Sequence, residues 1–344
     1  MAGIFDYVTA AEMCSYYGVV NGGNAAYLGD TLFPADKRLG LDLSWFKGSK
    51  GLPVVLKAAA FDTGAPLRNR IGVEKVEAEM PYFKEATLIK ERDRQDLNKI
   101  IGSGNQSYID LVLKRIFDDN LALIDGARAQ LERMRMQLLS DGGIEIASNG
   151  IALEYDYQMD PMHVGTAAAP WSDTEGSNPV EDLQEWMDVI ENDTGVRPAR
   201  GICSRKTWNY LLRNKAIKAD LSATAGDRLF VLDDVMAQYL MSRLGLDMKI
   251  YGRKFIDEAG APTAFYPDGR VTLMPEEALG TTWFGTTPEE SDLLGSAAAN
   301  VCVVETGIAV TTVKKTDPVN VETKVTMIAL PSFERVDEVF IGKV

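Results

Sequence analysis

One long amphipathic segment, from Ser107 to Leu139, constrains the fold more than any other feature. Apolar side chains recur in it at three- and four-residue spacing, the period of one helix face; they are Ile109, Val112, Leu113, Ile116, Leu123, Ile124, Ala127, Leu131, Met134 and Leu138. Ser107 stands where a helix N-cap belongs, and Gly142-Gly143 follows as a stop signal. At 1.5 Å per residue this helix spans about 50 Å, which is longer than the usual globular helix.

The stretch before this helix has the alternation of β-strands. Apolar residues occupy every second position from Leu39 to Leu43, and residues 73–89 alternate apolar with charged side chains. A turn signal, Asp62 to Pro66, separates the two. We interpret residues 37–93 as an extended hairpin. It carries many charges for each apolar residue, so it needs a partner chain to lie on. Residues 1–36 resemble an arm more than a domain core.

The chain after the long helix mixes helical and strand periods. Three helices are expected, at 180–192, 205–213 and 233–244. Strands are expected at 144–147, 151–157, 201–203, 249–251, 263–266 and 271–274, the last two joined as a hairpin by the turn Pro267 to Arg270. Strand-rich stretches at 301–313 and 324–329 would return the chain to an earlier layer. These elements predict an α+β protein, and 344 residues are enough for more than one domain.

Composition excludes several classes of function. The net charge of -14 argues against a nucleic-acid-binding module, because phosphate neutralisation by basic residues supplies most of the affinity of such proteins. No apolar run approaches the roughly 18 residues that span a bilayer. The N-terminal segment Met1 to Tyr17 carries Asp6 and Glu12 and does not have the pattern of a secretory signal.

The residues that usually carry catalysis are scarce. His163 is the one histidine, and a metal site formed with Asp156 and Asp160 is a weak alternative to a turn-region histidine. The glycine motif 102–107 is better explained as a loop and helix cap than as a dinucleotide site. We expect Cys14, Cys203 and Cys302 to be packing residues in a reducing cytoplasm. The sequence predicts no catalytic residue, no cofactor and no metal, and therefore no enzyme.

Several segments, in order along the chain, resemble the lambda-type major capsid protein E family of tailed bacteriophages. The arm Tyr27 to Pro34 and the strand start Leu39 to Asp42 are similar to the opening of that family. Further similarity lies in Phe61 to Pro66 with Arg68 and Arg70, in Met80 to Phe83, and in Arg197 to Ser204 followed by Trp208 to Leu211. The resemblance covers nearly the whole chain, and it rests on the order of these motifs.

The resemblance implies the Hong Kong phage-type capsid fold. In that fold residues 1–36 would be the N-arm and 37–93 the extended hairpin loop that lies on a neighbouring subunit. Residues 94–178 would form the peripheral domain, with the spine helix at 107–139. Residues 179–299 would form the axial α/β domain, and 300–344 would be C-terminal strands that return to the peripheral domain.

The implied function is a major capsid protein of the virion, which self-assembles into the icosahedral shell around double-stranded DNA. Its partners would be itself, as hexamers and pentamers, and separate scaffold, portal and decoration proteins. It would contact the packaged DNA without sequence specificity, contact no membrane, and assemble in the host bacterial cytoplasm. Two alternatives are a tail-tube or connector protein, and a hydrolase that uses the His163 group on a metal.

Candidate interface residues lie in the hairpin: Trp45, Phe46, Lys57, Arg68 and Arg70. For Trp45 and Phe46 local packing beneath the hairpin is an equally good interpretation. For each arginine alone a solvated position is the plainer interpretation. A lysine–asparagine crosslink, which some members of the family use, has no recognisable motif in this sequence.

Overall fold

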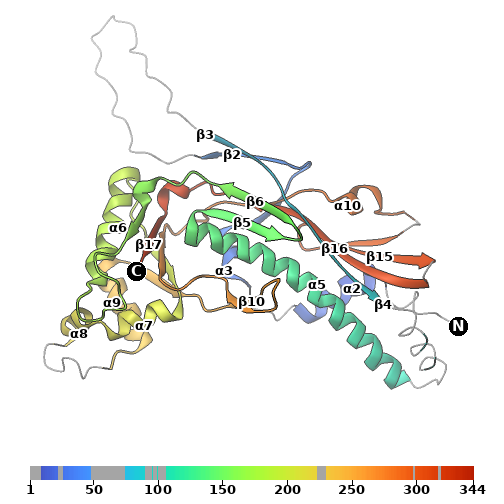
Figure 1. Cartoon of the computed structure of the whole chain (residues 1–344), viewed down its shortest axis with the longest axis horizontal. Helices are drawn as coiled ribbons and strands as arrows, with labels where there is room; N and C mark the ends of the chain where they lie inside the picture. The colour runs from blue at the N-terminus through green and yellow to red at the C-terminus, as the bar shows by residue number, and fades with distance from the viewer. Residues whose placement is uncertain are drawn as a thin grey trace, which may run out of the picture. The chain divides into compact units, whose positions relative to one another are not determined.

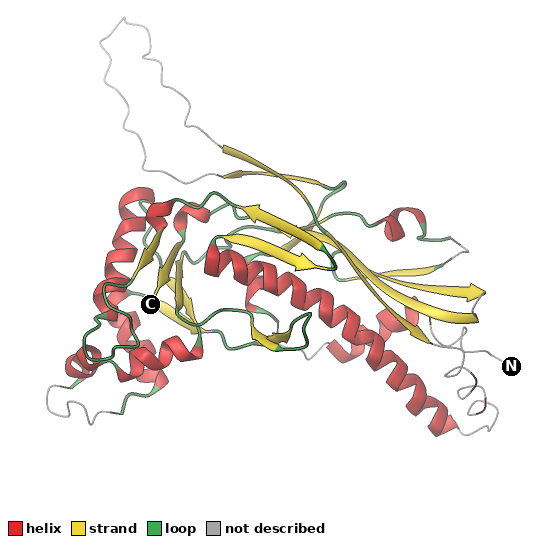
Figure 2. Ribbon diagram, viewed as in Figure 1, coloured by secondary structure: helices red, strands yellow, loops and turns green. Residues whose placement is uncertain are grey.

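The computed structural model describes residues 9–21, 26–47, 74–89, 95, 99, 106–222, 230–296, 299–316 and 319–344. The chain divides into two units, each assembled from three stretches of sequence. Unit 1 takes the ranges 1–43, 77–133 and 281–332, and unit 2 takes 44–76, 134–280 and 333–344. Helices and strands occur in both, so the predicted α+β class is confirmed (Figure 2).

Unit 1 is built on a six-stranded sheet (Figure 1). The strand order is β1-β13-β16-β15-β14, with β4 also paired to β16. The strands are β1 (Ala35–Lys37), β4 (Tyr82–Ile89), β13 (Thr282–Phe284), β14 (Asn300–Val304), β15 (Ile308–Thr316) and β16 (Val319–Pro331). β1 runs parallel to β13, and the other pairs are antiparallel. The sheet therefore joins β4, near the start of the chain, to strands near its end.

Among the described residues, the helices that lie wholly or partly in unit 1 include α2 (Ala10–Asn21), α3 (Leu28–Leu32), α10 (Pro288–Asp292) and the first part of α5 (Gln106–Asp141). α5 confirms the predicted spine helix and ends where expected. Gly142 follows it with a φ of 74°, a conformation that glycine adopts without strain, and its N–H donates to the Leu138 carbonyl. Within unit 1, Val112 and Ile116 of α5 pack on buried Val321 of β16, so the periodic apolar face meets the sheet.

The described part of the predicted hairpin is formed by two paired strands. β2 (Asp42–Lys47) pairs with β3 (Glu74–Glu79), and the Met80 N–H donates to the Leu41 carbonyl at their end. Residues 48–73, which include the predicted turn, lie outside the described residues. The described residues thus contain two paired strands of the expected hairpin, but β4, which was expected to continue it, pairs with β16 in the sheet of unit 1. The limits 37–93 stay a prediction.

Unit 2 has a five-stranded sheet in the order β7-β17-β12-β8-β9. The strands are β7 (Val164–Thr166), β8 (Arg200–Cys203), β9 (Asp247–Ile250), β12 (Arg270–Met274) and β17 (Phe340–Lys343). The central strand β12 is antiparallel to β17 and β8, while both outer pairs are parallel. Val271 to Met274 are buried, as two-sided cover of a central strand requires.

The core of unit 2 lies between this sheet and helices α6 (Pro179–Thr194), α7 (Arg205–Arg213), α8 (Lys215–Leu221) and α9 (Asp233–Leu244). The helices at 180–192, 205–213 and 233–244 are confirmed, and α8 was not predicted. Trp186 of α6 stacks on Phe340 at 5.3 Å and lies against Gly342, where an added Cβ would meet its ring at 2.2 Å. Gly342 therefore lets α6 approach β17 closely.

One buried carboxylate fixes the start of α6. Asp182 is 6% exposed and accepts a hydrogen bond from the indole N–H of Trp171 at 2.8 Å. It also accepts the backbone N–H of Ala168 at 3.2 Å. The carboxylate lies in the first turn of α6, where the helix dipole favours negative charge. It thus ties the loop before α6 to the helix.

The predicted hairpin between 263–266 and 271–274 is wrong. β11 (Pro262–Ala264) pairs with β10 (Lys254–Ile256), and β12 pairs with β17 and β8 instead. All three residues of β11 are exposed, whereas Val271 to Met274 of β12 are buried between the neighbouring strands. The expected strands at 144–147 and 151–157 do form an antiparallel hairpin, β5 (Gly143–Ser148) with β6 (Ile151–Asp156).

The C-terminal strands divide between the two sheets. β14, β15 and β16 lie in the six-stranded sheet, while β17 lies in the five-stranded sheet. The domain limits expected from the resemblance stay a prediction.

Candidate assembly surfaces

The residues predicted to form an interface are only partly described. Trp45 of β2 is 6% exposed, and its ring stacks on Tyr157 with the centroids 5.2 Å apart. This contact is local packing beneath the hairpin, one of the two interpretations of Trp45 that the sequence allowed. Lys57, Arg68, Arg70 and the side chain of Phe46 lie outside the described residues. An interface role for these five residues stays a prediction.

The structure separates the three residues of the possible metal site. Asp156 accepts the Gln158 N–H, and Asp160 caps the short helix η1 (Pro161–His163) by accepting the Met162 N–H. His163 is fully buried, with Nε2 3.4 Å from a carboxylate oxygen of Asp193. Among the described residues no group of three His, Cys, Asp or Glu side chains could hold a metal ion.

Helix α2 is fastened to the sheet edge of unit 1. Cys14 and Cys302 form a disulfide between α2 and β14, which corrects the expectation that these cysteines are reduced packing residues. The hydroxyl of Tyr17 donates to Glu305 at 2.5 Å, and the Ala11 N–H donates to the side chain of Asn300 at 3.3 Å. The N-terminal helix is therefore held covalently and by hydrogen bonds.

Cys203, in contrast, behaves as expected. It is fully buried in the core of unit 2. Burial raises the pKa of its thiol to about 12, because the thiolate would lose its hydration. A thiol held in this form is a packing residue without nucleophilic character.

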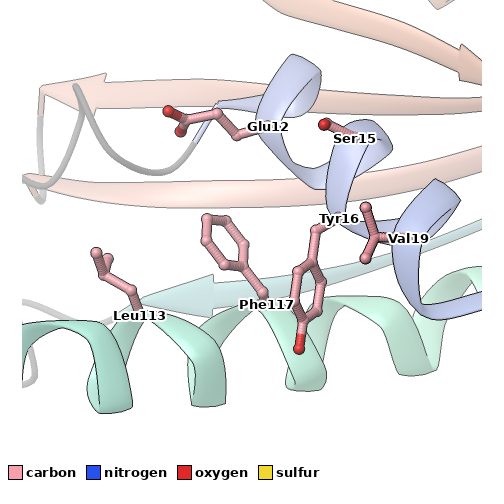
Figure 3. Close-up of a pocket in the computed structure, with 6 residues that line it drawn as sticks. All are labelled: Glu12, Ser15, Tyr16, Val19, Leu113 and Phe117. Carbon is pink, nitrogen blue, oxygen red and sulfur yellow. The ribbon is translucent and has the colours of Figure 1, made fainter. Parts of the chain in front are cut away.

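An apolar groove lies between α2 and α5 in unit 1 (Figure 3). It has a volume of about 350 Å³ and is lined by Glu12, Ser15, Tyr16, Val19, Leu113 and Phe117. The Tyr16 and Phe117 rings lie side by side at 5.5 Å, and the Tyr16 hydroxyl donates to Asp118 at 2.7 Å. This hydrogen bond, with burial, raises the pKa of Tyr16. The groove is open to solvent at Val19, which is 80% exposed.

A network of charged residues joins α10 to the sheet of unit 1. Glu289 accepts hydrogen bonds from Lys324 of β16 at 2.5 Å and from the Tyr82 hydroxyl of β4 at 3.1 Å, and Glu290 pairs with Lys37. Burial and the Glu289 charge raise the pKa of Tyr82 to about 12. Burial opposes ionisation of Glu289, but the hydrogen bonds from Lys324, from the backbone and from Tyr82, together with the Lys324 charge, outweigh it, so the pKa of this carboxyl falls below its usual range. The network fixes α10 on the sheet.

Comparison with known proteins then settles the family. The model of the phage major capsid protein E family matches residues 21–344. The chain belongs to the phage major capsid protein E family. The resemblance seen in the sequence is thereby confirmed, and so is the function of a major capsid protein of a phage head. No curated protein matches the chain.

Solved structures share the fold at low sequence identity. A protein assigned as a capsid protein of an Escherichia coli CFT073 prophage has a TM-score of 0.61 at 16% identity, covering 98% of this chain and 99% of that one. A phage-related protein of Bordetella bronchiseptica RB50 has a TM-score of 0.58 at 13% identity, with 98% and 97% covered. The capsid of cyanophage A-1(L) has a TM-score of 0.51 at 11% identity, with 93% and 94% covered. The predicted capsid fold is confirmed.

The comparisons also test the alternative of a tail-tube or connector protein. The family and the capsid structures with the same fold are structural shell proteins, and none of them favours the tail-tube or connector alternative. In the described part of the chain no helix is long and apolar enough to cross a membrane.

Proposed function

We propose that this chain builds the icosahedral head of a tailed phage as hexamers and pentamers and acts there without catalytic turnover. The family match over residues 21–344 carries the proposal. Closed shells need repeated contacts between different surfaces of identical subunits. The capsid fold supports such contacts by providing two units with separate sheets in one chain.

The partners of the shell belong to the same proposal. Scaffold, portal and decoration proteins would be separate chains, and the head would assemble in the host bacterial cytoplasm. The DNA inside would be held without sequence-specific contacts. The net charge of -14 supports this, because an acidic lining lets DNA slide where a basic one would bind it.

The extended hairpin is the proposed interlock between subunits. Its candidate contact residues are Trp45, Phe46, Lys57, Arg68 and Arg70. Replacing Arg68 and Arg70 together by glutamate should lower the yield of particles, because two positive charges would become negative at the contact. Particles formed at the normal yield would refute the interlock at these arginines.

Negative-stain electron microscopy of the purified protein, alone and with its scaffold, tests the function itself. Closed shells, or sheets and rings of hexamers, are the expected result. Tubes of uniform width without any shell would favour the tail alternative. A protein that stays monomeric in every condition would refute the proposal.

A further inference from the structure

One helix of unit 2, α6, is strongly acidic. α6 carries six acidic residues and no basic residue. Asp182 is buried, and Arg197 pairs with Asp188 and Glu191 at the C-terminal end of the helix. Glu181 and Glu185 lie one turn apart on the exposed face and form no ion pair with any described residue. They leave a negative row facing solvent.

The next two helices of the same unit carry an uninterrupted block of basic charge. Residues 205–218, which span α7 and the first half of α8, contain five basic residues and no acidic one. Arg205 pairs with Asp233 at 2.6 Å, and Lys206 lies 3.7 Å from Asp268. The other three, Arg213, Lys215 and Lys218, form no ion pair with a described residue. The described ion pairs of unit 2 do not join α6 to α7 or α8.

An exposed apolar group lies beside the basic helices. Phe230, Leu232 and Val235, at the start of α9, are 84%, 57% and 42% exposed. The start of α9 is held against α7, because Asp233 accepts hydrogen bonds from Arg205 and from the Trp208 indole. α7, α8 and α9 lie together in this part of unit 2 (Figure 1). Exposed apolar side chains gathered beside polar ones are typical of a surface that another protein covers.

We propose that the negative row of α6 in one copy of the chain binds the positive surface of α7 and α8 in the next copy, with the apolar group of α9 buried at the same contact. Contacts that close a ring of identical subunits are heterologous, so each chain must carry both complementary surfaces. Unit 2 carries both, and Glu181 and Glu185 on one side and Arg213, Lys215 and Lys218 on the other form no ion pair with a described residue. The inference rests on the proposed function, since it names the contact between neighbouring subunits in a ring.

The occupant is a second copy because both halves of the contact lie on the same chain. Nucleic acid could bind the positive surface, but it would be repelled by the negative row and by the net charge of -14. Opposite charges also favour one register of the two surfaces over others, which gives a ring its fixed angle.

Charge reversal tests the contact. One variant, Glu181→Lys with Glu185→Lys, makes both surfaces positive, and a second, Lys215→Glu with Lys218→Glu, makes both negative. The control Glu145→Lys with Glu154→Lys makes the same charge change on the β5–β6 hairpin, where these residues are exposed and opposite each other. Circular dichroism and thermal unfolding of each purified variant establish that it is folded before particles are counted by electron microscopy.

Each reversed variant alone should lose particle yield by more than about tenfold, because like charges then meet at every contact in the ring. Combining all four substitutions in one chain should restore particles, because every contact in hexamers and in pentamers then again joins opposite charges. The control variant should assemble as the wild type does.

Two results would overturn the inference while leaving the proposed function standing. The first is wild-type yield from either reversed variant alone. The second is a loss of yield that the chain with all four substitutions does not restore, since this would show that charge complementarity is not the cause. Failure of the wild-type protein to form any shell would instead refute the proposed function.

Discussion

Replacing Asp182 by alanine should destabilise unit 2 by about 1.5–4 kcal/mol. The Trp171 indole N–H would lose its acceptor at 2.8 Å, and the Trp171 side chain is fully buried, so water cannot take the place of the carboxylate. An unsatisfied buried donor costs about 1–3 kcal/mol. The Ala168 N–H, bound at 3.2 Å, belongs to an exposed residue and can turn to water, so its loss adds roughly 0.5–1 kcal/mol.

Urea unfolding at pH 7 and low protein concentration, followed by tryptophan fluorescence, measures this loss of stability. Asp182→Asn retains one acceptor oxygen for Trp171 and should cost about 1 kcal/mol. Glu185→Ala, one turn further along α6 and exposed, is the matched control and should lie within about 0.5 kcal/mol of the wild type. If Asp182→Ala also unfolded within that range, the carboxylate would not be the tie between loop and helix.

Two further perturbations test other contacts. Gly342→Ala should destabilise the protein by about 1–3 kcal/mol in a thermal unfolding assay, because the added Cβ would overlap the Trp186 ring. Gly252→Ala is the control and should be nearly neutral in the same assay, because no atom lies within 4 Å of its added Cβ. Glu289→Gln should remove a stability contribution that exists only while Glu289 is ionised. The pKa of Glu289 is lower in the folded state than in the unfolded state, partly because of Lys324. The stability difference between wild type and variant should therefore be largest above about pH 4.5 and should vanish as pH falls through the folded pKa. An unchanged difference at pH 3 would refute this assignment.

Local periodicity accounts for what the sequence could predict. α5, α6, α7 and α9 each have an apolar face of helical period, and each was located close to its observed bounds. α8 was missed because only Ile217 of its seven residues is buried, so it has no apolar face to recognise. The periodic signal therefore follows burial along one helix face, and short surface helices escape it.

Pairing between distant segments could not be predicted. β12 looked like half of a local hairpin, yet its partners are β8 and β17, and the choice depends on which neighbours cover both of its faces. The Cys14–Cys302 disulfide joins residues 288 apart, and it depends on α2 lying against β14. Neither spacing nor composition carries this information.

For the candidate surfaces, too, the sequence predicts one part and the rest depends on the fold. The hairpin residues were singled out by their exposure in the sequence pattern, and Trp45 is in fact covered by Tyr157. The separation of charge between α6 and the α7–α8 pair is visible in the sequence as a block of acids followed by a block of bases. Which of those charges is already paired within the chain depends on the fold, because Arg197 and Asp233 come from outside the blocks.

The six-stranded sheet of unit 1 can form only late in the synthesis of the chain. Ile89 at the end of β4 pairs with Val321 of β16, so β4 has no partner until almost the whole chain has been synthesised. At about 5–20 residues per second a ribosome needs roughly 10–50 s to pass from one to the other. During that time β4 and the apolar face of α5 are without the strand on which they pack. A chain cut short before β16 cannot complete unit 1, so the pool from which shells grow is restricted to full-length subunits.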